Sequence, residues 1–242
     1  IIAEEFTSKD ELRNESIGSR IKRKLPPLVN GLGHLALQYR YYFTSHRPKL
    51  DSATMDDPAV TVVDYFANLD VEAAQKATYV SNYWGPLAAI LPQWGITVNW
   101  IHIEVTSAVL PDVSSARATI RGLNRRNGLS RHVLLQDYLT LRVAFKAAAQ
   151  YVRIRRTTKQ VAAQISWVDI ESGLDVAPLI HSRLHSDLRG MGAARNALWL
   201  SLFREVSPAQ TAQGSCLYLM ENQPWELALL QSRMTHGDGP NV

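Results

Sequence analysis

Three stretches of the chain show the short-range hydrophobic pattern of strands. Residues 59–66 are rich in β-branched and aromatic side chains, residues 96–105 alternate apolar and polar positions, and residues 215–220 form a short apolar run after a turn-like Ala-Gln-Gly. Alternation with a period of two, and short apolar runs beside turn residues, are typical of strands. We therefore expect strands at these three places.

Elsewhere apolar residues recur every three or four positions, which predicts helices. The sequence favours helices that start near Pro86 and cover 113–127, 135–165 and 176–205. Strands that alternate with helices predict an α/β fold with a mainly parallel, Rossmann-like, doubly wound sheet. Because the span between the second and third expected strands is too long for one crossover, residues 113–210 are expected to be a helical insertion.

The same pattern divides the chain into a leading segment and one larger domain. Residues 1–58 are polar, charged or loop-like, and we expect a helical and linker segment there. Residues 59–242 are expected to form the Rossmann-like domain with its insertion. The basic cluster Arg20–Lys24 has two interpretations, a solvated helix or a contact with anionic lipid headgroups.

Composition and charge narrow the classes of partner. The chain is 46% hydrophobic and 20% charged, as folded globular proteins are. A net charge of +4 and a pI near 9.2 suit an anionic ligand or a membrane surface, and are too modest to predict nucleic-acid binding. The lone Cys216 excludes an internal disulfide and a cysteine-built zinc site. Without a signal-like segment or a long apolar run, the expected location is cytoplasmic, with peripheral association with the inner membrane left open.

Two chemistry-bearing residues fall in the first two expected strands. Asp64 lies near the carboxyl end of the first strand, which in a parallel sheet is the edge that faces ligands. His102 lies within the second. Both have an alternative interpretation, because carboxylates at strand ends also hold loops and a lone histidine in a strand is often a core residue. Asp70, by contrast, is expected only to cap a helix.

The third expected strand breaks into a helix at Glu221–Glu226. Pro224 suits the first turn of a helix, and Glu226 complements the positive helix N-terminus. Polar side chains where a strand becomes a helix suggest a binding cleft of an open α/β sheet. The alternative interpretation, that this is a helix cap with solvated polar residues, stays open.

The remaining candidates are less specific. Asn82, Tyr83 and Trp84 precede a helix and suit either stacking on a sugar or base, or packing in the core. Of the histidines, only His181 and His185 are four apart, and the Ser-Arg-Leu between them lacks the Glu of a metalloprotease helix. We therefore predict no metal site.

Five short motifs stand out along the chain: Asp64–Asp70 (DYFANLD), Ser81–Leu87 (SNYWGPL), Asn99–His102 (NWIH), Gln136–Leu139 (QDYL) and Leu217–Leu229 (LYLMENQPWELAL). In this order and spacing they resemble a family of bacterial surface carbohydrate biosynthesis proteins that are glycosyltransferase-like. The resemblance implies one half of a two-domain, GT-B-type architecture. In the family the last helix leads to a further strand and a second nucleotide-binding domain, so the chain is expected to be an N-terminal fragment, with that second domain beyond residue 242.

The resemblance also implies a reaction, the transfer of a sugar from a nucleotide-activated donor to a glycan or lipid-linked acceptor. Such transfer needs a carboxylate base or nucleophile and polar groups that hold sugar hydroxyls. Glu221 is expected to supply the carboxylate, with Asp64 and His102 as further catalytic residues. The expected substrate-binding residues are Asn222, Gln223, Trp225, Glu226, Asn82, Tyr83, Trp84 and Asn99. No cofactor is expected, because the nucleotide sugar is itself a substrate.

Two other classes of function remain beside sugar transfer. One is a non-catalytic component of a polysaccharide assembly complex that binds a glycan or a lipid headgroup. The other, a regulatory nucleic-acid-binding domain, is disfavoured by the low and dispersed positive charge. The transferase hypothesis predicts that Glu221 lies with Asp64 and His102 in one pocket at the carboxyl edge of the sheet, and that Glu221→Gln abolishes transfer.

Overall fold

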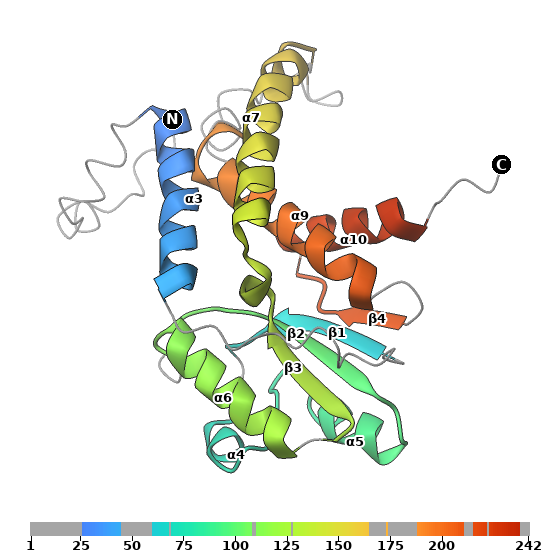
Figure 1. Ribbon diagram of the computed structural model, residues 1–242. Helices are drawn as coiled ribbons and strands as arrows, with labels where there is room; N and C mark the ends of the chain where they lie inside the picture. The colour runs from blue at the N-terminus through green and yellow to red at the C-terminus, as the bar shows by residue number, and fades with distance from the viewer. Residues whose placement is uncertain are drawn as a thin grey trace. The chain divides into compact units, whose positions relative to one another are not determined.

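The computed structural model describes residues 26–44, 60–67, 69–107, 110–126, 128–164, 173, 188–210, 215–221 and 223–237 (Figure 1). This part of the chain contains seven α-helices, one 3-10 helix and four strands. The chain forms two compact units, one made of residues 1–34 and 151–195 and the other of residues 35–150 and 196–242. The basic cluster Arg20–Lys24 lies outside the described residues.

The second unit contains the sheet. Its strands are β1 (Val60–Tyr65), β2 (Val98–Ile103), β3 (Ser130–Leu134) and β4 (Ser215–Tyr218), all parallel and in the order β3-β2-β1-β4 (Figure 1). The α/β class and the parallel sheet are therefore as predicted, and the order is compatible with one half of a doubly wound, Rossmann-like fold. The winding direction reverses between β1 and β4, where such folds bind ligands beyond the carboxyl ends of the strands.

Burial follows the position of each strand in the sheet. All six residues of β2 are buried, as are the four inner residues of β1, because both strands are central and covered on both faces. In β3, burial alternates, with Ser130, His132 and Leu134 inside. The β4 strand is an edge of the sheet among the described residues, and its burial is only partial.

One prediction about the insertion is wrong. Residues 113–210 were expected to be helical throughout, but β3 lies within them and pairs with β2. The segment carries Ser130, Arg131 and His132, so it lacks the apolar run or the clear alternation that marks a strand in the sequence. Around it lie α6 (Val113–Arg126), the 3-10 helix η2 (Leu135–Tyr138), α7 (Leu141–Gln164) and α9 (Met191–Gln210).

Two short helices connect β1 to β2. The first, α4 (Val71–Gln75), begins after Asp70, whose carboxylate accepts a hydrogen bond from the Ala73 N–H at 2.8 Å. The predicted capping role of Asp70 is thereby confirmed. The second, α5 (Leu87–Gln93), has Pro86 at its N-cap, close to the expected start.

A buried ion pair fixes the turn that follows β3. The Arg117 Nε of α6 donates to the Asp137 carboxylate of η2 at 2.7 Å, and both side chains are almost fully buried. The Asn124 side chain exchanges two hydrogen bonds, each of 2.8 Å, with the backbone of His132. Together these contacts hold α6 against β3 and fix the backbone position of His132.

The first unit contains a close contact between the start of α3 (Pro27–Thr44) and α7. The Tyr151 hydroxyl lies 2.7 Å from the carbonyl oxygens of both Pro27 and Arg189. A Cβ atom at Gly31 would overlap the Tyr151 ring, so the approach requires glycine at this position. None of the helices in the described residues combines the length and apolar character that crossing a membrane requires.

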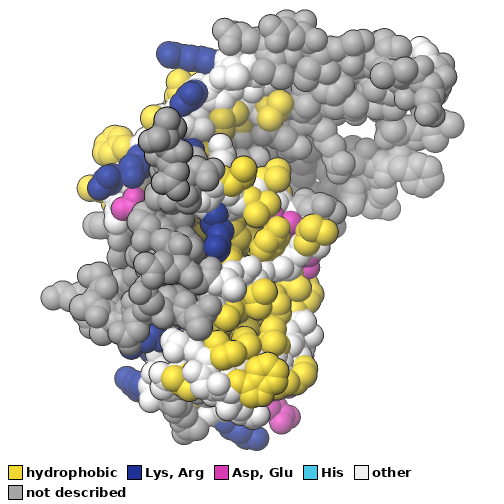
Figure 2. Space-filling model, turned by 90° about the vertical axis from the view of Figure 1, so that its right-hand side faces the viewer, with side chains coloured by type: hydrophobic (Ala, Val, Ile, Leu, Met, Phe, Trp, Pro, Cys, Tyr) yellow, Lys and Arg dark blue, Asp and Glu magenta, His cyan; other side chains and the backbone are white. Residues whose placement is uncertain are grey.

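The last helix, α10 (Pro224–Gly237), is apolar on two faces. Trp225, Ala228 and Leu229 are buried, whereas Leu227 and Met234 are about 70% exposed. Figure 2 looks at the side of the molecule on which β4 and α10 lie, and hydrophobic side chains gather on this face. An exposed apolar stripe of this kind is more than a solvated helix needs.

Candidate functional site

A buried carboxylate at the end of β1 is the centre of a polar cluster. Asp64 is 1% exposed, and its Oδ2 accepts hydrogen bonds from the Tyr79 hydroxyl at 2.7 Å and from the Trp84 Nε1 at 3.2 Å. Its Oδ1 lies 2.6 Å from the His102 Nδ1. Three donors around one buried carboxylate supply the hydrogen bonds that burial of its charge requires.

The parallel register explains why Asp64 meets His102. The two residues are paired across β1 and β2, so their side chains point to the same face of the sheet. The segment between α4 and α5 covers this face and brings Tyr79 and Trp84 over it. The Tyr79 ring packs against Trp100 and His102, with centroids 4.7 and 5.3 Å away.

A second imidazole extends the cluster to β3. The His102 Nε2 lies 3.0 Å from the His132 Nδ1, and the two rings are nearly parallel, at 5°. In the register, His132 pairs with Trp100 rather than with His102, so the two histidines are diagonal neighbours on the same face. Asp64, His102 and His132 thus form a hydrogen-bonded chain across three strands, hereafter the Asp–His–His chain.

The hydrogen-bond partners determine which ring nitrogens carry protons. An ionised Asp64 can only accept, so the proton of that bond sits on the His102 Nδ1. In a neutral His102 the Nε2 then accepts from the His132 Nδ1–H, and the His132 Nε2 is left with a free lone pair. That nitrogen is buried and has no hydrogen-bond partner among the described residues.

Burial favours the uncharged forms of the side chains around this chain. It lowers the pKa of His132 well below the usual 6.5, and a positive charge on the neighbouring His102 would lower that pKa further. Burial also raises the pKa of Tyr79 well above its usual 10.0, with a smaller contribution from the charge and hydrogen bond of Asp64. At neutral pH His132 is therefore a neutral imidazole and Tyr79 a neutral phenol.

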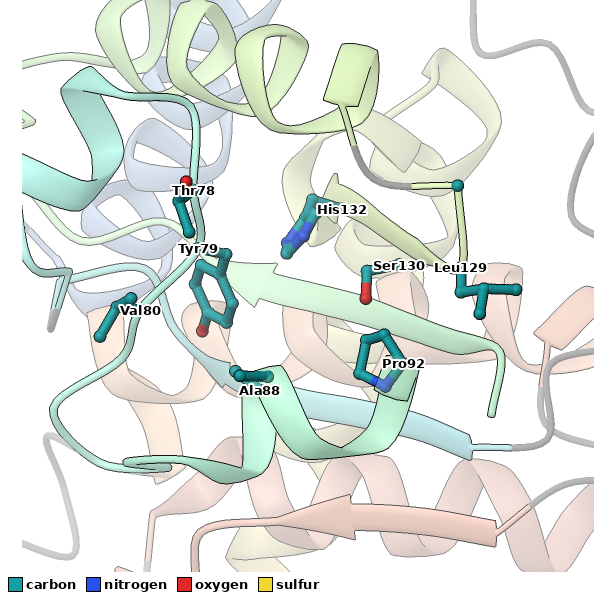
Figure 3. Close-up of a pocket in the computed structure, with 10 residues that line it drawn as sticks. Thr78, Tyr79, Val80, Ala88, Pro92, Leu129, Ser130 and His132 are labelled. Carbon is teal, nitrogen blue, oxygen red and sulfur yellow. The ribbon is translucent and has the colours of Figure 1, made fainter. Parts of the chain in front are cut away.

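A pocket of about 360 Å³ adjoins His132 (Figure 3). Tyr79 and Val80 line it from the segment after α4, Ala88 and Pro92 from α5, and Ser130 and His132 from β3. Figure 3 shows the side chains of Tyr79, Ala88, Pro92, Ser130 and His132 around a common space, with His132 directed toward Tyr79. The ring whose Nε2 has no partner among the described residues is thus part of a cavity wall.

The Glu221–Glu226 segment has a different structure from the one predicted for a cleft. Glu226 is 5% exposed, and its Oε1 accepts hydrogen bonds from the N–H groups of Glu221 at 2.8 Å and of Gln223 at 2.9 Å. This is the carboxylate half of a capping box, in which the third helical residue bonds back to the N-cap. The side chains of Glu221 and Gln223 are exposed, and Asn222 lies outside the described residues.

Trp225 packs on the face of the sheet opposite Asp64. Its Nε1 donates to the Tyr65 hydroxyl at 2.7 Å, and the two rings meet edge to face. Tyr65 follows Asp64 in β1, and successive side chains of a strand point to opposite faces. The structure therefore brings Asp64 and His102 together, and does not bring Glu221 to them as the single-pocket prediction required.

The other predicted substrate-binding residues are scattered in their roles. Asn82 and Tyr83 are exposed, whereas Trp84 binds Asp64 through its Nε1. Asn99 is 1% exposed on β2, three residues before His102 and hence on the other face. Its Nδ2 has no hydrogen-bond partner among the described residues.

Two members of the polar cluster were not among the predicted site residues, His132 and Tyr79. No strand was expected at residues 130–134, so His132 was not placed beside His102, and Tyr79 was not singled out. The sequence carries no local signal for either residue, because Ser130 and His132 are polar residues at buried positions of β3.

Neither a metal site nor a reactive thiol is found in the part of the chain that the structure describes. No three His, Cys, Asp or Glu side chains there are grouped to hold an ion. His181 and His185 lie outside the described residues. Burial raises the pKa of the Cys216 thiol, which suits a small packing residue better than a nucleophile.

The Asp–His–His chain resembles the arrangement in which a carboxylate orients one imidazole as a general base, with a second imidazole added. It can accept a proton at the His132 Nε2 and keep the resulting positive charge on His102, beside Asp64. Comparisons of the chain with protein-family models, with characterised proteins and with solved structures found no match.

Proposed function

We propose that the protein transfers a sugar from a nucleotide-activated donor to a hydroxyl group of a glycan or lipid-linked acceptor in bacterial surface polysaccharide biosynthesis. The family resemblance of five ordered motifs supports the substrate class. The observation that carries the proposal is the Asp–His–His chain, with links of 2.6 and 3.0 Å, which ends beside a pocket at an imidazole nitrogen with no partner among the described residues.

The chemistry of transfer needs what this chain can provide. The acceptor hydroxyl oxygen attacks the anomeric carbon of the donor, and the bond from that carbon to the phosphate oxygen breaks with its electron pair on the phosphate. The hydroxyl proton passes to the His132 Nε2, while the His132 Nδ1 proton moves to the His102 Nε2. The positive charge then rests on His102, where the Asp64 carboxylate stabilises it.

This proposal assigns the base to a different place from the sequence prediction. The described contact of Glu221 is the hydrogen bond from its backbone N–H to Glu226, and not a contact with Asp64 or His102. Its side chain is exposed, so Glu221 could act as the catalytic carboxylate only on a donor bound at the surface beyond β4. The geometry favours the Asp–His–His chain, because it is buried and oriented as a base must be. A second, nucleotide-binding domain of GT-B type is part of the same proposal.

The test is a transfer assay on the full-length protein with a panel of nucleotide sugars and hydroxyl acceptors, with product detection by mass spectrometry. We expect His132→Gln to reduce turnover by about 10²–10⁴-fold, the usual contribution of a general base. The matched control is Glu221→Gln, an exposed carboxylate outside the chain, for which we expect little change.

The reverse pattern, with Glu221→Gln inactive and His132→Gln active, would contradict the assignment of the base and restore the first prediction. If the full-length protein binds glycan but transfers no sugar from any donor, the transferase proposal fails. The function would then be that of a non-catalytic component that binds a glycan or a lipid headgroup.

A further inference from the structure

The pocket beside His132 carries no charge that would hold a phosphate. Among the described residues ten line it, and none is Lys, Arg, Asp or Glu. Phosphates are bound by cationic side chains or by free N–H groups at helix N-termini. Here the N–H groups of Ala89 and Ile90, at the start of α5, already donate to the Pro86 carbonyl.

Half of the ten lining residues are apolar, and the polar side chains among the rest are uncharged hydroxyls, those of Thr78, Tyr79 and Ser130, and the imidazole of His132. The apolar residues are Val80, Ala88, Ala89, Pro92 and Leu129. The volume of about 360 Å³ is at the lower end of the range of about 300–1,000 Å³ found for small-molecule sites. A small, uncharged compound with an apolar surface therefore fits the space and its walls.

The distinctive polar group of the pocket is an acceptor. The ring of His132 is fully buried, and its Nε2 has no partner among the described residues while its Nδ1 is bound to His102. With Asp64 ionised and both histidines neutral, that Nε2 carries a lone pair and no proton. A buried acceptor without a donor is costly, so a ligand that brings an O–H group gains from supplying it.

We infer that this pocket binds an uncharged hydroxyl compound whose O–H donates to the His132 Nε2. If the proposed function holds, this pocket is the acceptor subsite, a name that rests on that function, and the diphosphate of the donor binds elsewhere. The binding itself does not require that any sugar be transferred. The substrate class it selects is an alcohol, with one hydroxyl directed into a pocket whose lining is half apolar.

The experiment compares two probes of similar shape, cyclohexanol and cyclohexanone, on the full chain with ¹⁵N-labelled histidine. Cyclohexanol can donate a hydrogen bond and cyclohexanone cannot. We expect cyclohexanol to shift the ¹⁵N resonance of the His132 Nε2 toward its protonated position, and to bind roughly ten-fold more tightly than cyclohexanone. Inorganic pyrophosphate, the charged probe, should leave this resonance unchanged.

Two variants distinguish binding of cyclohexanol in the pocket from binding on the surface of the protein. Ala88→Leu fills the pocket from α5 without touching the Asp–His–His chain, and should weaken the binding of cyclohexanol by roughly ten-fold or more. Ala118→Leu places the same side chain on an exposed position of α6 and should leave binding unchanged.

The inference is overturned if cyclohexanol does not bind saturably, if it binds without moving the His132 Nε2 resonance, or if pyrophosphate displaces it. Its failure is distinct from that of the proposed function. Binding of cyclohexanol by a protein that transfers no sugar keeps the pocket assignment, whereas sugar transfer without this binding keeps the function and removes the subsite.

Discussion

Replacing Asp64 by Asn should reverse the tautomers of both histidines. The asparagine side chain would keep the shape of the carboxylate, but it offers one acceptor oxygen and one donor NH₂ group. If the oxygen serves Tyr79 and Trp84, the NH₂ group faces the His102 Nδ1, which must then lose its proton. His102 donates through Nε2, and the His132 Nε2 becomes protonated.

The structure also indicates how strongly this orientation is preferred. In the opposite orientation the NH₂ group faces the Trp84 Nε1–H, which can only donate and loses its partner. A buried unpaired donor costs about 1–3 kcal/mol, and Trp84 is half-buried, so we take about 1 kcal/mol. The reversed tautomer should therefore predominate by roughly five- to ten-fold.

The change should affect both stability and activity. Hydrogen bonds to a charged group contribute about 1.5–3 kcal/mol each, but the desolvation of a buried carboxylate opposes them, so we expect a net loss of about 1–3 kcal/mol in the free energy of unfolding. The proposed sugar transfer should fall by on the order of 10⁴-fold, as catalysis does when the corresponding change imposes the wrong tautomer in a Ser-His-Asp triad.

The assay is long-range ¹H–¹⁵N correlation spectroscopy, which distinguishes protonated from unprotonated imidazole nitrogens, with His132→Gln to assign the signals. Trp84→Phe alone should keep the wild-type tautomers, and Trp84→Phe combined with Asp64→Asn should give a mixture, because the preference for one orientation of the amide disappears. If the His132 Nε2 is unprotonated in both wild type and Asp64→Asn, the reasoning about the chain is wrong.

Four further outcomes follow from the described contacts. Folding lowers the pKa of His132, so just below pH 6.5 the imidazole is protonated in the unfolded chain and neutral in the folded one. The free energy of unfolding should therefore fall by up to about 1.4 kcal/mol for each pH unit below 6.5. Urea titrations should show this slope in the wild type and not in His132→Gln. The raised pKa of Tyr79 gives the opposite dependence on pH, because above pH 10 the phenol is ionised in the unfolded chain only, and the free energy of unfolding should fall as the pH rises. Tyr79→Phe should reduce that loss in the same titrations. Glu226→Ala should cost about 1–2 kcal/mol in thermal unfolding by removing the shared acceptor of the cap, whereas Glu226→Gln, which keeps an Oε1, should cost less; equal losses would contradict the cap. Gly31→Ala should cost about 1–3 kcal/mol because its Cβ overlaps Tyr151, and Gly33→Ala, which meets nothing, serves as the control.

The strands and caps with strong local patterns were predictable from the sequence. The β1 and β2 strands are dominated by β-branched and aromatic residues, and Asp70 stands where a helix begins, so short-range rules suffice for them. The β3 strand could not be found in this way, because Ser130 and His132 are polar residues at buried positions. Their burial depends on partners, such as His102 and Asn124, that are distant in the sequence.

At the candidate site, local pattern predicted a cleft that the described residues do not form. The Glu-Asn-Gln cluster after β4 resembled a binding cleft in the sequence, yet the structure uses Glu226 to close a helix N-terminus and Trp225 to pack on Tyr65. Side-chain direction along β1 separates Tyr65 from Asp64 although they are adjacent. Which residues of two neighbouring strands lie side by side depends on the register of the strands, and the local sequence pattern does not give that register.

The three residues of the Asp–His–His chain are far apart in the sequence, and this affects when the chain forms during folding. Asp64 and His102 are 38 residues apart, and His102 and His132 are 30 apart. Contacts this distant form only after the intervening loops have closed, which makes them slow and late. No short peptide cut from the chain should reproduce the unusual imidazole resonances, and their appearance in a refolding experiment would mark the moment at which β1, β2 and β3 have docked in register.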